Sequence, residues 1–190
     1  SAPQQISVKG KKELITVYEL LGTKKTFKLF NEIEGEGDGR ITKFVGHKRE
    51  LSFLKNYVDR LASGEIKQGV VLSVFGPKGI GKSRIVHELI GYIVSKNLIC
   101  LQVWFLPYGM HNVIVYDYNS KSMIKFDQLL QVINQKIQQH SAIVVIDDID
   151  FATSQQMVLL KELFSVVAKS PLLVWCLHRL EFSHPCSAER

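Results

Sequence analysis

The sequence predicts an α/β fold of three layers, in which helices cover both faces of a mostly parallel β-sheet. Two observations indicate it. From about Lys43 onward, short apolar runs without polar alternation take turns with segments whose apolar residues recur at helical spacing. Such runs are typical of strands buried on both faces, and parallel strands need helical crossovers between them. In addition, a glycine-rich loop stands between the first of these strands and the helix after it.

Each element follows from its own run of residues. The expected strands span residues 70–75, 98–105, 142–147 and 171–177, and each is short and mostly apolar. Stripes of apolar residues at helical spacing predict the helices. These stripes are Leu51, Leu54, Val58 and Leu61; Ile85, Val86, Leu89, Ile90 and Ile93; Phe126, Leu129, Leu130, Ile133 and Ile137; and Met157, Leu160, Leu163, Phe164 and Val167.

The first 43 residues differ from the rest of the chain in pattern. In residues 1–21, two alternating apolar segments flank a Gly-Lys-Lys turn, which predicts a short β-hairpin. A hairpin alone is barely stable in water, so we expect it to belong to a further sheet. Residues 22–43 combine acidic residues with glycines, which is typical of a linker. The expected domains are therefore a tail at 1–21, a linker at 22–43 and an α/β domain at 44–190.

Charge and composition bear on several classes of protein. The net charge is +6 at pH 7, but the lysines are scattered and form no basic stripe, so charge alone gives little support to nucleic-acid binding. The three cysteines lie far apart without a CxxC pair, which argues against a disulfide framework or a zinc site. No apolar run approaches the roughly 18 residues of a membrane span, and no signal peptide opens the chain, so we expect a cytoplasmic protein. Because the first residue is Ser1, we expect a piece of a longer protein.

The segment GPKGIGKS matches the pattern GxxxxGK[ST] at every fixed position. Glycines let phosphate oxygens approach the backbone, whose N–H groups form an anion-binding nest at the start of a helix. In this pattern the Lys82 ammonium faces the β- and γ-phosphates, and the Ser83 hydroxyl is a ligand of Mg²⁺. The pattern therefore predicts binding of ATP with Mg²⁺. The candidate nucleotide contacts are Gly76, Pro77, Lys78, Gly79, Ile80, Gly81, Lys82, Ser83 and Arg84.

Two adjacent carboxylates complete the predicted metal site. Asp147 and Asp148 stand at the carboxyl end of the apolar run AIVVI. Beside a phosphate loop, Asp147 would hold Mg²⁺, and Asp148 would orient or deprotonate the attacking water. Asp150 is interpreted as a helix-start acid or a surface charge. The last predicted strand ends in CLHRL, where His178 or Arg179 could contact the γ-phosphate; Asp148 and Arg179 are the candidate catalytic residues.

These motifs resemble those of the AAA+/STAND class of P-loop ATPases. KFVGHKREL, upstream of the loop, is similar to the FVGRExEL box of that class, with His47 and Lys48 in place of its arginine and glutamate. In the class this box lies against the adenine, which implies that Val45 and Gly46 contact the base. DDIDFAT is similar to the DDLHWAD of the class, with Thr153 in place of the third aspartate, and VWCLHRLEF is similar to its sensor strand.

The opening segment carries a second resemblance. ISVKGKKELITVYELLG looks like the last two strands of a class III nucleotidyl cyclase domain, which commonly read VKGxxxPVxVYEL. Cyclase tail, linker and ATPase form the layout of the soluble adenylyl cyclase type. The resemblance implies cyclic-nucleotide signalling by a full-length protein, with cyclase and C-terminal helical domains as intramolecular partners. It also implies that this chain lacks the catalytic carboxylates of the cyclase and stops before the helical lid of the ATPase domain.

The expected function is that of an ATP-binding regulatory module whose hydrolysis is slow or absent and which switches contacts between neighbouring domains. One alternative is a nucleic-acid-linked ATPase of origin-recognition or transcription-regulator type, which the net charge permits although no helix-turn-helix is visible. Another is a scaffold that holds nucleotide only structurally. A small-molecule kinase shares the phosphate loop, but the box upstream of the loop argues against it.

Overall fold

The computed structural model describes residues 4–6, 15–17, 44–107 and 112–180, and the chain divides into two compact units, 1–44 and 45–190. In the first unit, β1 (Gln4–Ile6) pairs antiparallel with β2 (Ile15–Val17). The predicted Gly-Lys-Lys turn and the predicted linker at 22–43 lie outside the described residues. All candidate site residues lie in the second unit.

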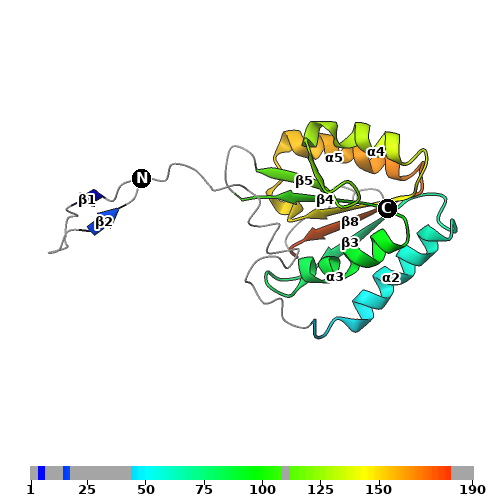
Figure 1. Ribbon diagram of the computed structural model, residues 1–190, viewed down its shortest axis with the longest axis horizontal. Helices are drawn as coiled ribbons and strands as arrows, with labels where there is room; N and C mark the ends of the chain where they lie inside the picture. The colour runs from blue at the N-terminus through cyan, green and yellow to red at the C-terminus, as the bar shows by residue number, and fades with distance from the viewer. Residues whose placement is uncertain (1–3, 7–14, 18–43, 108–111, 181–190) are drawn as a thin grey trace. The chain divides into compact units, whose positions relative to one another are not determined.

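Within the described part of the second unit, six strands form one sheet in the order β3-β8-β7-β4-β5-β6. β3, β8, β7 and β4 run parallel, whereas β5 and β6 are antiparallel (Figure 1). The predicted mostly parallel sheet is confirmed. The strands are β3 (Val70–Phe75), β4 (Ile99–Phe105), β5 (Val113–Asp117), β6 (Ser122–Ile124), β7 (Ala142–Asp147) and β8 (Leu172–His178).

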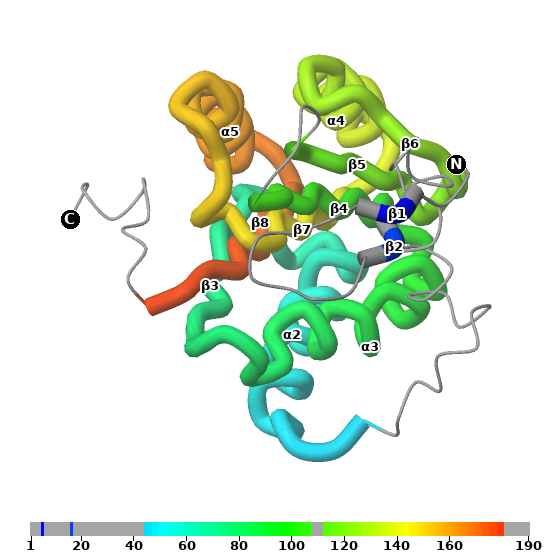
Figure 2. The backbone as a smooth tube through the Cα atoms, turned by 90° about the vertical axis from the view of Figure 1, so that its left-hand side faces the viewer, coloured from blue at the N-terminus to red at the C-terminus, as the bar shows by residue number. Residues whose placement is uncertain are grey.

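Helices cover both faces of this sheet, so the second unit has the predicted three layers. α2 and α3 lie on one face, and α4 and α5 lie on the other, as Figure 1 and the end-on view in Figure 2 show. The helices are α2 (Lys48–Ala62), α3 (Lys82–Ser95), α4 (Leu129–Lys136) and α5 (Ser154–Val167), with short 3-10 turns η1 (Phe126–Gln128) and η2 (Ile149–Phe151).

The inner strands β7 and β8 form the centre of the core, and every residue of both strands is buried. Because side chains alternate across a strand, each of these strands contributes to the packing on both faces. Val144 and Val174 belong to the apolar cluster that includes Leu160 and Leu163 of α5. Their neighbour Ile143 is equally buried but points to the face covered by α2 and α3. This two-sided burial explains why both strands read as unbroken apolar runs.

Sequence reasoning missed the antiparallel edge of the sheet. β5 pairs with β4, with Val115 opposite Val103, and β6 follows it as a short outer strand. The signal was present: VIVYD is rich in β-formers and is followed by the turn residues Asn119 and Ser120. A run of only five residues is too short to predict a strand without a partner that it pairs with.

A buried carboxylate fastens this edge to α4. Asp117, the last residue of β5, has a side chain only 2% exposed, and it accepts a bond from Lys136 Nζ at 2.7 Å. The Ser120 hydroxyl and the backbone N–H of Asn119 donate to the same carboxylate, at 2.7 and 3.0 Å. Burial alone would raise the pKa of Asp117, but the bonds from Lys136, Ser120 and Asn119 outweigh it and hold the pKa below its ordinary value. Asp117 therefore stays ionised and depends on its cation.

Replacing Lys136 by methionine should lower the free energy of unfolding by about 3 kcal/mol at about pH 7, because the Asp117 carboxylate is left buried without its cation. Urea unfolding measures the change. Lys161→Met, at an exposed position of α5, is the matched control and should stay within about 0.5 kcal/mol of the parent chain.

The same pair predicts a pH dependence. A carboxylate whose folded-state pKa lies below its unfolded-state pKa adds stability above the unfolded value, and this stability is lost as the pH falls through the folded value. The difference between the parent chain and Lys136→Met should therefore shrink below about pH 4. Equal losses in the Lys136 and Lys161 variants would contradict this role of Lys136.

Candidate functional site

The glycine-rich loop lies at the carboxyl end of β3 and leads directly into α3. Gly79 and Gly81 have φ values of 81° and 106°, a region that side chains with a Cβ rarely adopt. Gly81 is the N-cap of α3, and no side chain among the described residues caps that helix end. The first N–H groups of α3 therefore face the loop with their positive dipole end available to an anion. The backbone N–H of Gly76 donates to the carbonyl of His178 at 3.3 Å, which ties the loop to the end of β8.

The loop lysine is folded back over the loop. Lys82 Nζ donates to the backbone carbonyls of Gly76 and Pro77 at 3.0 and 3.2 Å. These bonds place a positive charge against the backbone of the loop. Neutral carbonyls are weaker partners for an ammonium than phosphate oxygens are, so a bound phosphate would compete for this group.

The other predicted loop contacts differ in their surroundings. Lys78 and Ile80 are exposed beside the turn. Arg84 forms an ion pair with Glu88, one helical turn further along α3. Its predicted contact with nucleotide stays a prediction.

Asp147, the last residue of β7, points to the start of α3. The Ser83 hydroxyl donates a hydrogen bond to its carboxylate, so the two predicted Mg²⁺ ligands are in contact. Asp147 is only 2% exposed, and its Oδ1 is buried without a hydrogen-bond partner among the described residues. Burial raises the pKa of Asp147 to about 6, and the charge of Asp148 adds to this, whereas Ser83 and Lys82 oppose it.

The chemistry of this pair fits a hard divalent cation. Mg²⁺ prefers carboxylate and hydroxyl oxygens, and Asp147 and Ser83 bring one of each to the same place. A buried carboxylate oxygen without a partner is costly, and a cation would relieve that cost. The residues present therefore suit the metal that the loop pattern implies.

Asp148 lies at the same edge of the sheet as the loop. It is exposed, and its φ of 54° places a non-glycine residue in the left-handed region. Partial burial and the charge of Asp150 raise the pKa of Asp148, against the opposing charges of Lys82, Arg179 and Lys78. The carboxylate thus lies within electrostatic range of the loop lysine, and its strained backbone turns the chain away from β7 into η2.

The structure separates the two candidates at the end of β8. His178 is buried, its Nδ1 donates to the carbonyl of Arg179 at 2.7 Å, and its Nε2 is hydrogen-bonded to the hydroxyl of Ser73. Both ring nitrogens are thus engaged in holding the strand end. The Arg179 side chain is 42% exposed and contacts the carboxylate of Asp150 through Nε at 3.4 Å. Arg179 is the better placed of the two to reach a ligand.

The segment predicted to face the base lies close to the loop. Val45 is 81% exposed, and Gly46 has a φ of 90°. His47 Nε2 donates to the carbonyl of Ile80 at 2.9 Å, which joins this segment to the glycine-rich loop. Sequence reasoning treated His47 only as a departure from the family box; its contact with the loop could not be read from a local pattern.

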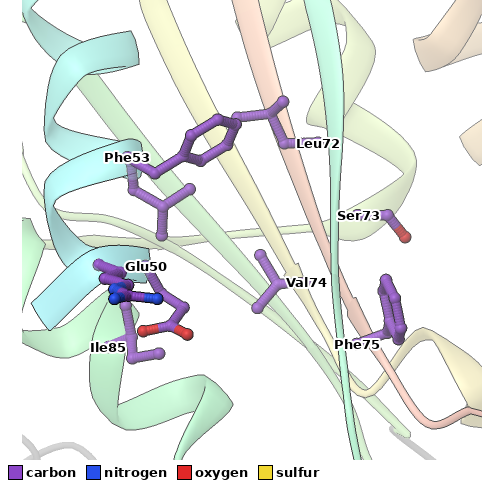
Figure 3. Close-up of a pocket in the computed structure, with 9 residues that line it drawn as sticks. Glu50, Phe53, Leu72, Ser73, Val74, Phe75 and Ile85 are labelled. Atoms are coloured by element: carbon purple, nitrogen blue, oxygen red, sulfur yellow. The ribbon is translucent and has the colours of Figure 1, made fainter. Parts of the chain in front are cut away.

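An apolar hollow of about 560 Å³ lies along β3, between α2 and the start of α3. In Figure 3, Phe53 of α2 and Leu72 and Val74 of β3 project toward one another, whereas Ser73 and Phe75 project to the other side of the strand. The hollow thus extends around the edge of β3. Loop residues 76–83 do not line it, so it is adjacent to the phosphate-binding candidate and not part of it.

The comparisons with known proteins add little. No family model matches the chain, and no curated protein matches it. Among the matching solved structures is PCH-2 from C. elegans, with 11% sequence identity and a TM-score of 0.48. The match covers 72% of this chain and 38% of that chain, so this chain spans well under half of its length. A further finding is that the described helices are all too short or too polar to cross a membrane.

Asp147→Asn should stabilise the fold when neither Mg²⁺ nor nucleotide is present. Since the folded-state pKa of Asp147 is raised to about 6, the parent chain loses stability as the pH rises from the unfolded value through the folded one. The variant should avoid this loss, which amounts to about 3 kcal/mol at about pH 7 for a shift of roughly two units.

Chemical unfolding in the presence of a chelator measures this gain, and it should vanish below about pH 3, where Asp147 is mostly protonated in both states. Asp127→Asn, at an exposed position of η1, is the control and should gain nothing. A gain that is the same at both pH values would show that charge burial at Asp147 is not its cause.

Proposed function

We propose that this chain binds ATP with Mg²⁺ at the loop between β3 and α3. One observation carries the proposal: the loop lysine Lys82, the hydroxyl of Ser83 and the buried carboxylate of Asp147 lie together at the carboxyl edge of a parallel sheet. Ligands of α/β proteins bind at this edge. The positive-φ glycines and the uncapped start of α3 support the same assignment.

Different residues of the site would contact the phosphates, the metal and the base of the nucleotide. The backbone N–H groups of the loop and of the first turn of α3 would bind phosphate oxygens, and Lys82 would exchange its carbonyl partners for phosphate. Ser83 and Asp147 would hold Mg²⁺, which neutralises phosphate charge when it is bound. Val45 and Gly46 are proposed to lie against the base, and the contact of His47 with Ile80 would keep that segment close to the loop.

We propose further that the site hydrolyses ATP slowly, with Asp148 orienting the attacking water. The position of Asp148 beside the proposed metal ligand Asp147, and its exposure to solvent, support this role. Arg179 would contact the γ-phosphate from the end of the neighbouring strand β8. Slow turnover suits a switch better than a metabolic enzyme.

The proposed regulatory role of this activity is supported by sequence resemblance. The likeness of residues 1–21 to a cyclase tail supports a regulatory ATPase module in a cyclase-like signalling protein. In this proposal, residues 22–43 link the tail to the ATPase domain at 44–190, and nucleotide binding changes the contacts of that domain with its neighbours. The box around Val45 and Gly46 supports the STAND-type variant of this module.

Lys82→Ala should weaken Mg²⁺–ATP binding by about 10- to 100-fold, because a charge-assisted contact with phosphate is lost. Isothermal titration calorimetry with the full chain measures the affinity. Lys161→Ala is the matched control, since it removes an exposed lysine of α5 and should bind ATP as the parent does. Unchanged affinity in the Lys82 variant would remove the central claim.

Asp148→Asn should lower steady-state phosphate release by about 100-fold or more while ATP affinity changes little, because the amide cannot accept the proton of the attacking water. Malachite-green detection of released phosphate measures turnover. If the parent chain binds ATP but the two proteins release phosphate at the same background rate, the chain is a nucleotide-holding scaffold and not an ATPase.

A further inference from the structure

Asp150, three residues after the end of β7 at Asp147, is tied to the arginine that follows β8. Its side chain is only 8% exposed. The backbone N–H of Arg179 donates to Asp150 Oδ2 at 3.2 Å, and Arg179 Nε donates to the same oxygen at 3.4 Å. One carboxylate thus holds both the backbone and the side chain of Arg179.

The neighbour of Asp150 adds a second contact. The guanidinium carbon of Arg179 lies 5.1 Å from the centre of the Phe151 ring, within the range of a cation–π interaction. A bond at Nε and a ring against the guanidinium restrict both the position and the tilt of that group. The contacts to Asp150 use the Nε side and the backbone, while the side chain remains 42% exposed.

The strand end that carries this guanidinium lies beside the glycine-rich loop. The residue before Arg179 accepts the N–H of Gly76 through its carbonyl, so the end of β8 is bonded to the start of the loop. The charges of Arg179 and Lys82 also act on one carboxylate, that of Asp148. Since η2 follows β7 and Arg179 follows β8, the contact with Asp150 joins the two strand ends that border the site.

We propose that Asp150 and Phe151 are positioning residues that aim the guanidinium of Arg179 at the γ-phosphate of bound ATP. The inference rests on the proposed function, because it needs ATP at the loop. It assigns a role to Asp150, which the sequence alone predicts to be a helix-start acid or a surface charge. Asp150 does not touch the nucleotide in this arrangement and acts only through Arg179.

The test compares affinities for Mg²⁺–ATP and Mg²⁺–ADP, measured by calorimetry on the full chain, because only ATP carries the γ-phosphate. The parent should prefer ATP. Arg179→Ala and Asp150→Ala should each reduce that preference by about 10-fold, through the ATP affinity alone. The double variant should lose no more than either single variant, since both remove one contact. Unchanged ADP affinity and thermal midpoint separate this effect from a loss of structure.

Two further variants sharpen the result. Asp150→Asn keeps an oxygen that accepts the N–H groups of Arg179 and should retain most of the preference for ATP. Phe151→Leu leaves the carboxylate in place and should reduce the preference by about threefold, which keeps the proposal testable if Asp150→Ala does not fold. Asp127→Ala, on the exposed turn η1, is the control and should behave as the parent.

The outcomes distinguish a failure of the positioning role of Asp150 and Phe151 from a failure of the proposed function. If the parent binds ATP in a manner that needs Lys82, but Asp150→Ala and Phe151→Leu keep the full preference for ATP, the positioning role is wrong and the proposed function stands. A stronger preference in Asp150→Ala would also overturn it, because Asp150 would then restrain Arg179 from the phosphate. If the parent binds neither nucleotide, both the proposed function and this inference fall.

Discussion

Parallel pairing of β3, β8 and β7 is the constraint on which the candidate site depends. Parallel strands all end at the same edge of a sheet, so residues that lie far apart in the chain are brought side by side there. The loop after β3, Arg179 after β8 and Asp147 at the end of β7 are three such residues or segments. The bond between Ser83 and Asp147 spans this edge, since it connects the start of α3 to the end of β7. Loss of that pairing would scatter every element of the site.

The buried carboxylates show how the partner of a charge determines its role. Asp117 is paired with Lys136, its pKa is lowered, and it stabilises the edge of the sheet. Asp147 is about as buried, but a hydroxyl bonds to it while the Lys82 ammonium acts on it only through its charge, and its pKa is raised. A fold selected for stability alone would not keep such a group, and costs of this kind are typical of binding sites. Asp150 is a third case, in which the pair serves to hold its cation in place.

Lys82 supplies a positive charge that an anion at the loop would meet. Its ammonium donates to the carbonyls of Gly76 and Pro77, so the lysine side chain lies folded back over the loop. Binding of an anion at the loop therefore means an exchange of partners at Lys82. The nearby hollow along β3 has a different chemistry, because its lining is largely apolar and includes the exposed ring of Phe75.

The sequence by itself determined the parallel strands, the helices after them and the glycine-rich loop after β3, because each depends on a local pattern: an unbroken apolar run, a helical stripe, or glycines at fixed spacing. It also pointed to Asp147 and Ser83 as candidate Mg²⁺ ligands, and only the tertiary structure showed that these two side chains are in contact. The antiparallel strands β5 and β6 were not predicted because their runs are short and gain stability from pairing, β5 with β4 and β6 with β5. The tertiary structure alone decided that His178 is committed to Ser73, that His47 bonds the loop, and that Asp150 holds Arg179. Those contacts join residues 29 to 105 positions apart, and no local pattern records a partner at that distance.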